Sequence, residues 1–331
     1  MEFFIAIAAV IAFFILTVSY YTYYQCFRAD PKRRDDPYSP IRGKQYEENR
    51  ESMLRVTKIM DETPCEDISI HSHDGLTLWG RYYHTRDGAP LQILFHGYRS
   101  LALRDCAGMF ILAKKMGFNV LAVDQRSHGR SQGKAITFGI KEQYDCAKWV
   151  EYAANRFGKD MPIILSGLSM GAATVIMASE MELPGNVCCV IADCPFSSPK
   201  TIIRKVCRDR GFPEKLVYPF IAAGARLFGG FSLESGSAQD SVTRSRLPIL
   251  LLHGEADRFV PCEMSRSIHA SCASPSQLHT FPEAGHCLCY MIDPLRYEDV
   301  VTRFLWEIPH LRTAMEESDF VQKQLRGEMK Y

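Results

Sequence analysis

The sequence predicts an α/β protein built on a mostly parallel, doubly wound β-sheet. Short apolar runs of strand character alternate with helical patterns between residues 92 and 192, and such alternation places helices on both faces of a parallel sheet. A Gly-x-Ser-x-Gly turn at 167–171 joins one of these runs directly to a helix. A long apolar run stands near the N-terminus. These observations indicate one large α/β domain preceded by a membrane anchor.

The composition fits this organisation and excludes some classes of partner. The chain has 331 residues, of which 47% are hydrophobic and 23% charged, enough for one α/β domain plus an appendage. A net charge of +1 gives no reason to expect a nucleic acid partner. The 12 cysteines are scattered without a Cys-x-x-Cys pair, so we expect neither a zinc site nor a disulfide framework.

Residues 1–27 are predicted to be an uncleaved transmembrane anchor. The apolar run 3–24 carries no charge and would span about 33 Å as a helix at ~1.5 Å per residue, enough to cross a bilayer. A cleavable signal peptide is the rival interpretation, but it requires a basic start, whereas Glu2 is acidic. The run ends in tyrosines typical of a membrane interface. They are Tyr20, Tyr21, Tyr23 and Tyr24.

The flanks of this run predict the orientation of the anchor. Arg28 and the basic run 32–34 follow it, whereas no Lys or Arg precedes it. Because basic flanks stay on the cytoplasmic side of a membrane, we expect the catalytic domain in the cytoplasm. Residues 28–60 contain three prolines, and we interpret them as a linker leading into a helix near 46–60.

Residues 61–331 form the predicted α/β domain. A hairpin is expected at 68–71 and 77–84, around the turn signal Asp74-Gly75. Further strands are predicted near 92–95, 119–123, 163–165, 189–192, 249–252 and 278–281, with helices near 102–116, 141–157, 292–306 and 314–325. The alternation lapses at 196–247. An insertion there would lie above the carboxyl ends of the strands, as a cap or lid or as irregular packing helices.

The turn at 167–171 has the pattern of the nucleophile elbow of α/β hydrolases. A buried strand precedes it and a buried helix follows at 172–178. The two glycines allow strand and helix to approach closely while the hydroxyl of Ser169 stands exposed. Acyl transfer by a serine also needs a base, a carboxylate that orients the base, and backbone donors for the oxyanion.

Candidate partners of Ser169 follow the ends of later strands. His286 is the predicted base and Asp257 the predicted acid, in the order serine, acid, histidine that this class requires. Asp193 also ends a strand and is the main alternative acid, whereas Glu255 is a further neighbour of Asp257. Among other histidines, His128 comes too early in the chain, and His253 belongs to the loop that carries the acid.

The remaining site residues are expected to supply the oxyanion hole and the substrate pocket. The backbone N–H groups of Met170 and of Tyr98, in the loop 96–100, are the expected oxyanion donors. The side chain of Tyr98 could also line the pocket. Apolar residues of the cap are candidate contacts for an acyl chain: Val217, Tyr218, Phe220 and Ile221, with Phe228 beyond them. No metal and no organic cofactor are expected.

From about residue 67 to 310, the chain resembles the serine α/β hydrolase superfamily. It is similar in particular to the membrane-anchored and bacterial hydrolases that include the Bem46 and ABHD13-like proteins. The residues that carry the resemblance are His96-Gly97, Asp124-x-Arg126-x-His128-Gly129-x-Ser131, Gly167-Leu168-Ser169-Met170-Gly171, His253-Gly254-x-x-Asp257-x-x-Val260-Pro261 and Gly285-His286. The resemblance implies the hydrolase fold and the serine, aspartate and histidine triad, but it says little about substrate.

These patterns lead to an expected function and several alternatives. We expect a serine hydrolase that cleaves carboxylic esters, preferably small or medium acyl esters, through an acyl-enzyme. A lipid or thioester hydrolase of the lysophospholipase or depalmitoylase kind is the first alternative, because an anchor would place the site beside such substrates. A peptidase or feruloyl-type esterase is more distant. An inactive membrane-tethered scaffold is the alternative from another class, and the intact set of catalytic residues argues against it.

Overall fold

A single eight-stranded sheet forms the centre of the computed structural model, which describes residues 1–29, 36–41 and 43–328. The strand order is β1-β2-β4-β3-β5-β6-β7-β8. The strands are β1 (Glu66–His71), β2 (Thr77–Tyr83), β3 (Leu91–Phe95), β4 (Asn119–Asp124), β5 (Ile163–Leu168), β6 (Val187–Asp193), β7 (Ile249–Gly254) and β8 (Ser276–Phe281). The pairs β1–β2 and β2–β4 are antiparallel, and every other pair is parallel. The predicted mostly parallel sheet is confirmed.

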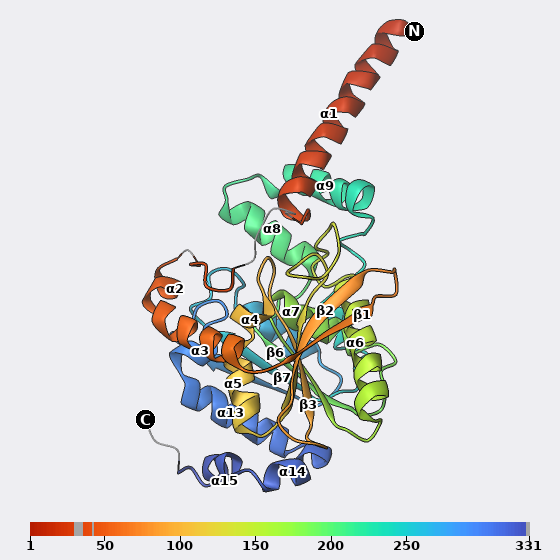
Figure 1. Cartoon of the computed structure of the whole chain (residues 1–331). Coiled ribbons are helices and arrows are strands. Elements are labelled where there is room, and N and C mark those ends of the chain that lie inside the picture. Colours follow the sequence, from red (N-terminus) through yellow and green to blue (C-terminus); the bar gives the residue numbers. More distant parts are fainter. Residues whose placement is uncertain (30–35, 42, 329–331) are drawn as a thin grey trace.

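Helices precede the sheet, follow its strands and build the insertion before β7 (Figure 1). They are α1 (Glu2–Cys26), α2 (Lys44–Glu48), α3 (Arg50–Glu62), α4 (Ala102–Asp105), α5 (Ala107–Lys115), α6 (Glu142–Phe157), α7 (Met170–Ala178), α8 (Pro199–Asp209), α9 (Glu214–Gly224), α10 (Ala238–Ser241), α11 (Glu263–Ser271), α12 (Cys289–Ile292), α13 (Pro294–Trp306), α14 (Pro309–Glu316) and α15 (Asp319–Leu325), with a π-helical turn η1 (Ala225–Gly229). The segment 196–247, predicted as a cap, contains α8, α9, η1 and α10.

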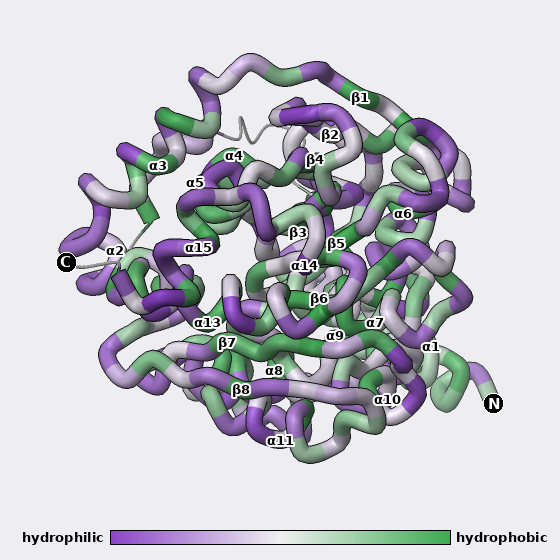
Figure 2. The backbone as a smooth tube through the Cα atoms, turned by 90° about the horizontal axis from the view of Figure 1, so that it is seen from below, coloured by the Kyte–Doolittle hydropathy of each residue, from purple (hydrophilic) through white to green (hydrophobic). Residues whose placement is uncertain are grey.

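The apolar runs of the strands supply two hydrophobic cores. In β5, Ile163 and Leu165 belong to the core shared with α6 and α7, whereas Ile164 belongs to the core shared with α5 and α13. Successive side chains of a strand point to opposite faces of the sheet, so a strand covered on both faces must be apolar throughout. Figure 2 shows this for β7, which is hydrophobic along most of its length, whereas the edge strand β8 is largely hydrophilic.

Three helices predicted as continuous are each divided in two. The segment 46–60 contains parts of α2 and α3, which meet at Asn49. The segment 102–116 contains α4 and α5, which meet at Cys106, and 314–325 contains the end of α14 and all of α15. The last break has a clear cause, because the Ser318 hydroxyl accepts a hydrogen bond from the Val321 amide and starts α15 anew. The spacing of apolar residues indicates which face of a helix is buried. Because this spacing continues across such breaks, it does not predict where one helix ends and the next begins.

The C-terminal end of α1 is integrated into the folded domain. Thr22 Oγ1 donates a hydrogen bond to the carbonyl of Phe220 in α9, at 3.1 Å. A Cβ atom on Gly224 would lie 2.3 Å from the carbonyl oxygen of Ser19, so the two backbones touch where this glycine stands. Phe27, just beyond α1, is completely buried. The helix is therefore anchored in the protein over its last turns.

The rest of α1 projects away from the body beside α9, whereas α14 and α15 lie on the far side of the domain (Figure 1). The helix has 25 residues, is long and apolar enough to cross a membrane, and is almost entirely exposed in its most apolar part. Arg28 lies over the ring of Tyr24, 4.9 Å from its centre. The basic run 32–34 that follows lies outside the described residues.

A buried ion-pair cluster joins the loop after β4 to two other parts of the domain. The guanidinium of Arg126, only 3% exposed, donates to both carboxylate oxygens of Asp145 in α6, at 2.6 Å each. It also donates to both oxygens of Asp74, between β1 and β2, at 2.9 and 3.0 Å. Burial raises the pKa of Asp145 to about 6 even with the arginine beside it. The position of Arg126 thus fixes the hairpin against α6.

We predict that Arg126→Met lowers the free energy of unfolding by about 3–5 kcal/mol, because it leaves the Asp145 carboxylate buried without its partner. Arg303→Met is the control, since Arg303 pairs with Asp299 on an exposed helix surface, and its loss should cost about 0.5 kcal/mol or less. Denaturant titrations of the detergent-solubilised variants measure both values. Equal stability of the two variants would show that the Arg126 cluster contributes no more than a surface pair.

Candidate active site

Ser169 stands on a strained turn between β5 and α7. Its backbone has φ 52° and ψ −111°, in the left-handed half of conformational space that non-glycine residues rarely adopt. A Cβ atom on Gly171 would lie 2.0 Å from the carbonyl oxygen of Phe95, and one on Gly167 would lie 2.3 Å from the backbone of Gly171. Both glycines are therefore required by contact, and the turn has the geometry expected of a nucleophile elbow.

The three predicted triad residues lie together at one edge of the sheet. Nε2 of His286 is 2.9 Å from Oγ of Ser169, and Nδ1 of His286 is 2.7 Å from Oδ2 of Asp257. The three residues follow β5, β7 and β8, whose parallel carboxyl ends meet at the same edge. The structure thus forms one chain of hydrogen bonds from the carboxylate through the imidazole to the hydroxyl.

The surroundings of Asp257 keep its carboxylate ionised. Oδ1 accepts hydrogen bonds from the amides of Phe259 and Val260, both at 2.8 Å, and Oδ2 lies 3.4 Å from Nε2 of the fully buried His253. Burial alone would raise the pKa of Asp257, but the hydrogen bonds to His253 and His286 hold this pKa well below its usual value. A fixed negative charge therefore faces Nδ1 of His286.

Neighbouring residues hold the His286 ring in place and raise its pKa. Burial by itself lowers the pKa of His286, but the nearby Cys194 sulfur and the hydrogen bond to Asp257 outweigh burial and raise the pKa above the usual value. The ring of Phe259 meets the imidazole edge to face, with centroids 5.1 Å apart. Phe259 is 45% exposed, so its ring forms part of the molecular surface beside the histidine.

Asp193, the alternative acid, has a different position. Its side chain is buried, Oδ1 has no hydrogen-bond partner within the described part of the chain, and burial raises its pKa to about 6. Its backbone carbonyl accepts a hydrogen bond from the Ser169 amide at 2.8 Å. Asp193 therefore supports the elbow through its main chain, whereas the carboxylate hydrogen-bonded to His286 is that of Asp257.

The predicted oxyanion donors lie on the two segments that border Ser169. Met170 is the first residue of α7, and the first amides of a helix have no partner within it. The loop after β3 passes close to Ser169, because a Cβ atom on Gly97 would lie 3.5 Å from Cβ of Ser169. Tyr98 is the next residue of this loop.

Two side chains hold the loop after β3 in place. The Gly97 amide donates to Oδ2 of Asp105 at 2.9 Å, and the Arg99 amide donates to Nε2 of His128 at 2.9 Å. Asp105 was missed by the sequence analysis, since a single acidic residue in a helical pattern carries no signal of this contact. His128, considered there only as a possible base, supports the loop instead.

The side chain of Tyr98 contacts the end of α1. Its hydroxyl donates to the carbonyl of Cys26 at 2.8 Å, and its ring centre lies 4.9 Å from that of Phe138. The ring of Phe138 is in turn 5.8 Å from that of Phe27. An aromatic cluster therefore connects the loop after β3 to the N-terminal helix.

The cap residues considered as acyl-chain contacts are largely engaged in packing. Tyr218 is buried and donates a hydrogen bond to Glu234 at 2.9 Å. Ile221 is also buried, and Val217 is half-buried against the same core. Phe220 faces α1, with its ring 6.3 Å from that of Phe14. A role of these four residues in substrate binding stays a prediction.

Helix α2, within the predicted linker, reaches the loop that carries His286. The hydroxyl of Tyr46 donates to the backbone carbonyl of His286 at 2.9 Å, and Nε2 of Gln45 donates to the carbonyl of Glu283 at 3.2 Å. A Cβ atom on Gly285 would collide with Gln45. No sequence pattern predicts either contact, because nearly 240 residues separate the partners.

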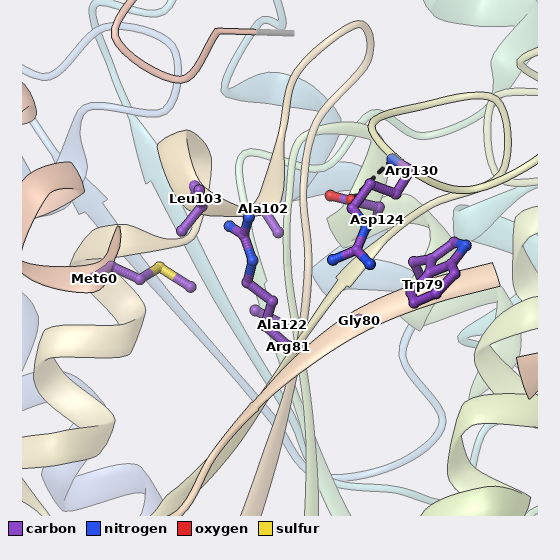
Figure 3. A pocket seen from close by; sticks show the side chains of 9 residues that line it. All are labelled: Met60, Trp79, Gly80, Arg81, Ala102, Leu103, Ala122, Asp124 and Arg130. Carbon is purple, nitrogen blue, oxygen red and sulfur yellow. Dashed lines mark hydrogen bonds between the residues drawn. The ribbon is translucent and has the colours of Figure 1, made fainter. Parts of the chain in front are cut away.

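Figure 3 shows a surface pocket that does not include the triad. Its volume is about 270 Å³ including space open to solvent. It is lined by residues of α3, β2, α4 and β4 and of the loop after β4, among them Trp79, Arg81 and Arg130, and the Arg130 amide donates to Asp124 at 3.2 Å. Ser169, Asp257 and His286 are absent from this lining, so the pocket is separate from the candidate active site.

Comparisons with known proteins show which families and structures the chain is similar to. A family model described as serine aminopeptidase, S33, matches residues 91–217. The uncharacterized protein YqkD of Bacillus subtilis is 24% identical over 263 residues, which cover 79% of this chain and 85% of YqkD. Protein bem46 of Schizosaccharomyces pombe is 26% identical over 174 residues, 52% of each chain. The solved structure of the Pyrococcus furiosus esterase Pf2001 matches with a TM-score of 0.62 and 26% identity, covering 76% of this chain and 93% of that chain.

The strand order, the elbow turn and these similarities together place the chain in the α/β hydrolase superfamily.

Proposed function

We propose that this protein is a serine hydrolase that cleaves carboxylic esters through an acyl-enzyme. The observation that carries the proposal is the continuous hydrogen-bond chain from Asp257 through His286 to Ser169. The relation to the Pyrococcus furiosus esterase supports an ester substrate. The intact chain of hydrogen bonds argues against an inactive scaffold, which would not require it.

In the proposed mechanism, Oγ of Ser169 attacks the ester carbonyl carbon while Nε2 of His286 takes the hydroxyl proton. Asp257 keeps the imidazole oriented and stabilises the imidazolium that forms. The backbone amides of Met170 and Tyr98 would donate hydrogen bonds to the oxyanion of the tetrahedral intermediate. His286 then gives its proton to the leaving alcohol.

Hydrolysis of the acyl-enzyme repeats these steps with water. His286 removes a proton from a water molecule, whose oxygen attacks the acyl carbonyl carbon. Collapse of the second tetrahedral intermediate returns the proton to Oγ of Ser169 and releases the carboxylic acid. The whole cycle consumes one ester and one water, and it needs no redox partner.

A lipid or thioester substrate is the second candidate. Helix α9 and the turn η1 carry large exposed apolar side chains, Leu216, Leu227 and Phe228, on the part of the cap that borders α1. The ring of Phe228 lies 5.1 Å from that of Tyr20 in α1. An apolar surface continuous with a membrane-crossing helix would lie against lipid, and a cap in that position could receive an acyl chain from the bilayer.

We further propose that α1 is retained as a membrane anchor. Signal peptidase cleavage near the end of the helix would remove or separate residues that the folded domain buries, including Ser19 and Phe27. The basic flank of the helix favours a cytoplasmic domain.

The first prediction of this proposal is that Ser169→Ala lowers kcat/KM for p-nitrophenyl esters by at least about 10⁴-fold, because the nucleophile is lost. The variant should also lose labelling by a fluorophosphonate probe while its thermal unfolding stays close to wild type. Ser179→Ala is the matched control, a buried serine at the other end of α7. Undiminished turnover in Ser169→Ala would remove this serine from the mechanism.

The same assay reports the substrate class. A series of p-nitrophenyl esters from acetyl to palmitoyl should give the highest kcat/KM with short or medium chains if small esters are the substrates. A steady rise toward palmitoyl would instead support the lipid or thioester candidate, and cleavage of amino-acid p-nitroanilides with no ester preference would support a peptidase.

The second prediction concerns the acid and the pH profile. His286 must be neutral to act as base, so kcat/KM should fall as the pH drops through its pKa, which its neighbours raise above the ordinary ~6.5. In Asp257→Asn this midpoint should move to lower pH, and kcat should fall by about 10⁴-fold. Asp193→Asn is the comparison: if it reduced kcat more than Asp257→Asn does, Asp257 would not be the acid.

The third prediction tests the anchor. Protein isolated from membranes should have the intact mass of the full chain, and a membrane-impermeant maleimide should label Cys65, which is exposed at the end of α3, only after the membrane is opened. Cys65→Ser provides the background labelling. A mass that lacks the first 20 to 30 residues, or labelling of Cys65 in intact cells, would contradict the proposed topology.

A further inference from the structure

Two cysteines lie beside His286, the proposed catalytic base. Cys194 directly follows β6, and Cys287 directly follows the histidine. Their sulfur atoms are 3.3 Å apart. The two sulfurs and a ring nitrogen of His286 all lie within 4.8 Å of one another. Because 93 residues separate the cysteines, no spacing motif in the sequence reveals this cluster.

The backbone holds both cysteines in an unusual conformation. Cys194 has φ 48° and Cys287 has φ 60°, in the same left-handed region as Ser169, whose φ is 52°. Such conformations persist only where the surrounding structure imposes them. The Cys194 amide donates to the carbonyl of Leu252 in β7 at 2.8 Å, which fixes this residue to the sheet.

We propose that Cys194, Cys287 and His286 form a binding site for a thiophilic divalent cation of the Zn²⁺ class, and that an ion bound there inhibits the enzyme. Two sulfurs and one imidazole nitrogen are a ligand set that Zn²⁺ prefers, with a fourth position left for water. On binding, each thiol proton passes to the buffer and a metal–sulfur bond replaces it. Two thiolates then balance the charge of the ion, and no oxidation is involved.

Binding of the ion and catalysis exclude each other, whichever ring nitrogen is used. Nδ1 of His286 is hydrogen-bonded to Asp257, and Nε2 is hydrogen-bonded to Ser169. An ion on Nε2 would occupy the lone pair that must accept the serine proton. An ion on Nδ1 would displace Asp257 and leave the proton of the neutral ring on Nε2. Either arrangement removes the base.

An ion can reach the cluster from the side of the histidine. The side chain of His286 is 13% exposed and Cys287 is half-buried, whereas Cys194 is completely buried behind them. The inhibitory effect rests on the proposed function, but binding of the ion does not. The two can therefore be tested separately.

Binding is measured with Co²⁺ on the metal-free full chain in detergent, kept reduced by a phosphine that does not bind as a thiol. We expect thiolate-to-cobalt charge-transfer absorption that saturates at one ion per chain. The band should persist in Ser169→Ala and disappear in Cys194→Ser/Cys287→Ser. Cys188→Ser is the matched control, a half-buried cysteine at the opposite end of β6, and it should keep the band. A wild-type protein without the band, or a band that survives in the double variant, would overturn the site.

Inhibition is measured with Zn²⁺ and a p-nitrophenyl ester. Zn²⁺ should inhibit the wild type reversibly, with full recovery on addition of EDTA. Cys287→Ser, and separately Cys194→Ser, should raise the concentration for half-inhibition by at least about tenfold, and Cys188→Ser should not change it. Inhibition that a reductant reverses and EDTA does not would identify a disulfide and reject the metal site. Full turnover in Ser169→Ala would contradict the proposed function. The Co²⁺ absorption band would still show whether the metal site exists.

Discussion

The backbone contact between α7 and β3 is the constraint on which the candidate site depends. The first turn of α7 lies so close to the end of β3 that a single added methyl group on Gly171 would overlap the carbonyl of Phe95. This contact brings Ser169 and the loop after β3 together, although about 70 residues of chain separate them. It also forces Ser169 into its strained conformation, which the buried strands on either side are able to hold.

Two further groups of contacts hold the segments on either side of Ser169. On one side, Asp105, His128 and the end of α1 hold the loop after β3. On the other side, His253 holds Asp257 and Tyr46 holds the loop of His286. Two of these supports, α1 and α2, come from the part of the chain that precedes the hydrolase sheet. The N-terminal segment is therefore part of the architecture of the site as well as a candidate anchor.

The sequence alone predicts those features whose pattern lies within a few neighbouring residues. Most strands appear as short apolar runs because both faces of the sheet are covered there. Ser169, Asp257 and His286 lie in the turns that follow β5, β7 and β8, in the order serine, acid, histidine. Residues whose role depends on a distant partner could not be predicted in this way. The fold brings distant segments together to form the contacts of Tyr46 and Asp105 and of the pair Cys194 and Cys287. The helix breaks at Asn49 and Cys106 were not predicted either, because the apolar face of each segment continues across its break.

The burial of Phe27 and the backbone contact at Gly224 have a consequence for how far the enzyme can reach. A catalytic domain on a flexible tether samples a volume set by the length of its linker. Here the last turns of α1 pack directly against the domain, so a membrane-crossing α1 would keep the candidate active site at one height and one tilt above the bilayer. The enzyme would then search by lateral diffusion in two dimensions, and only ester bonds presented at that height would be within its range.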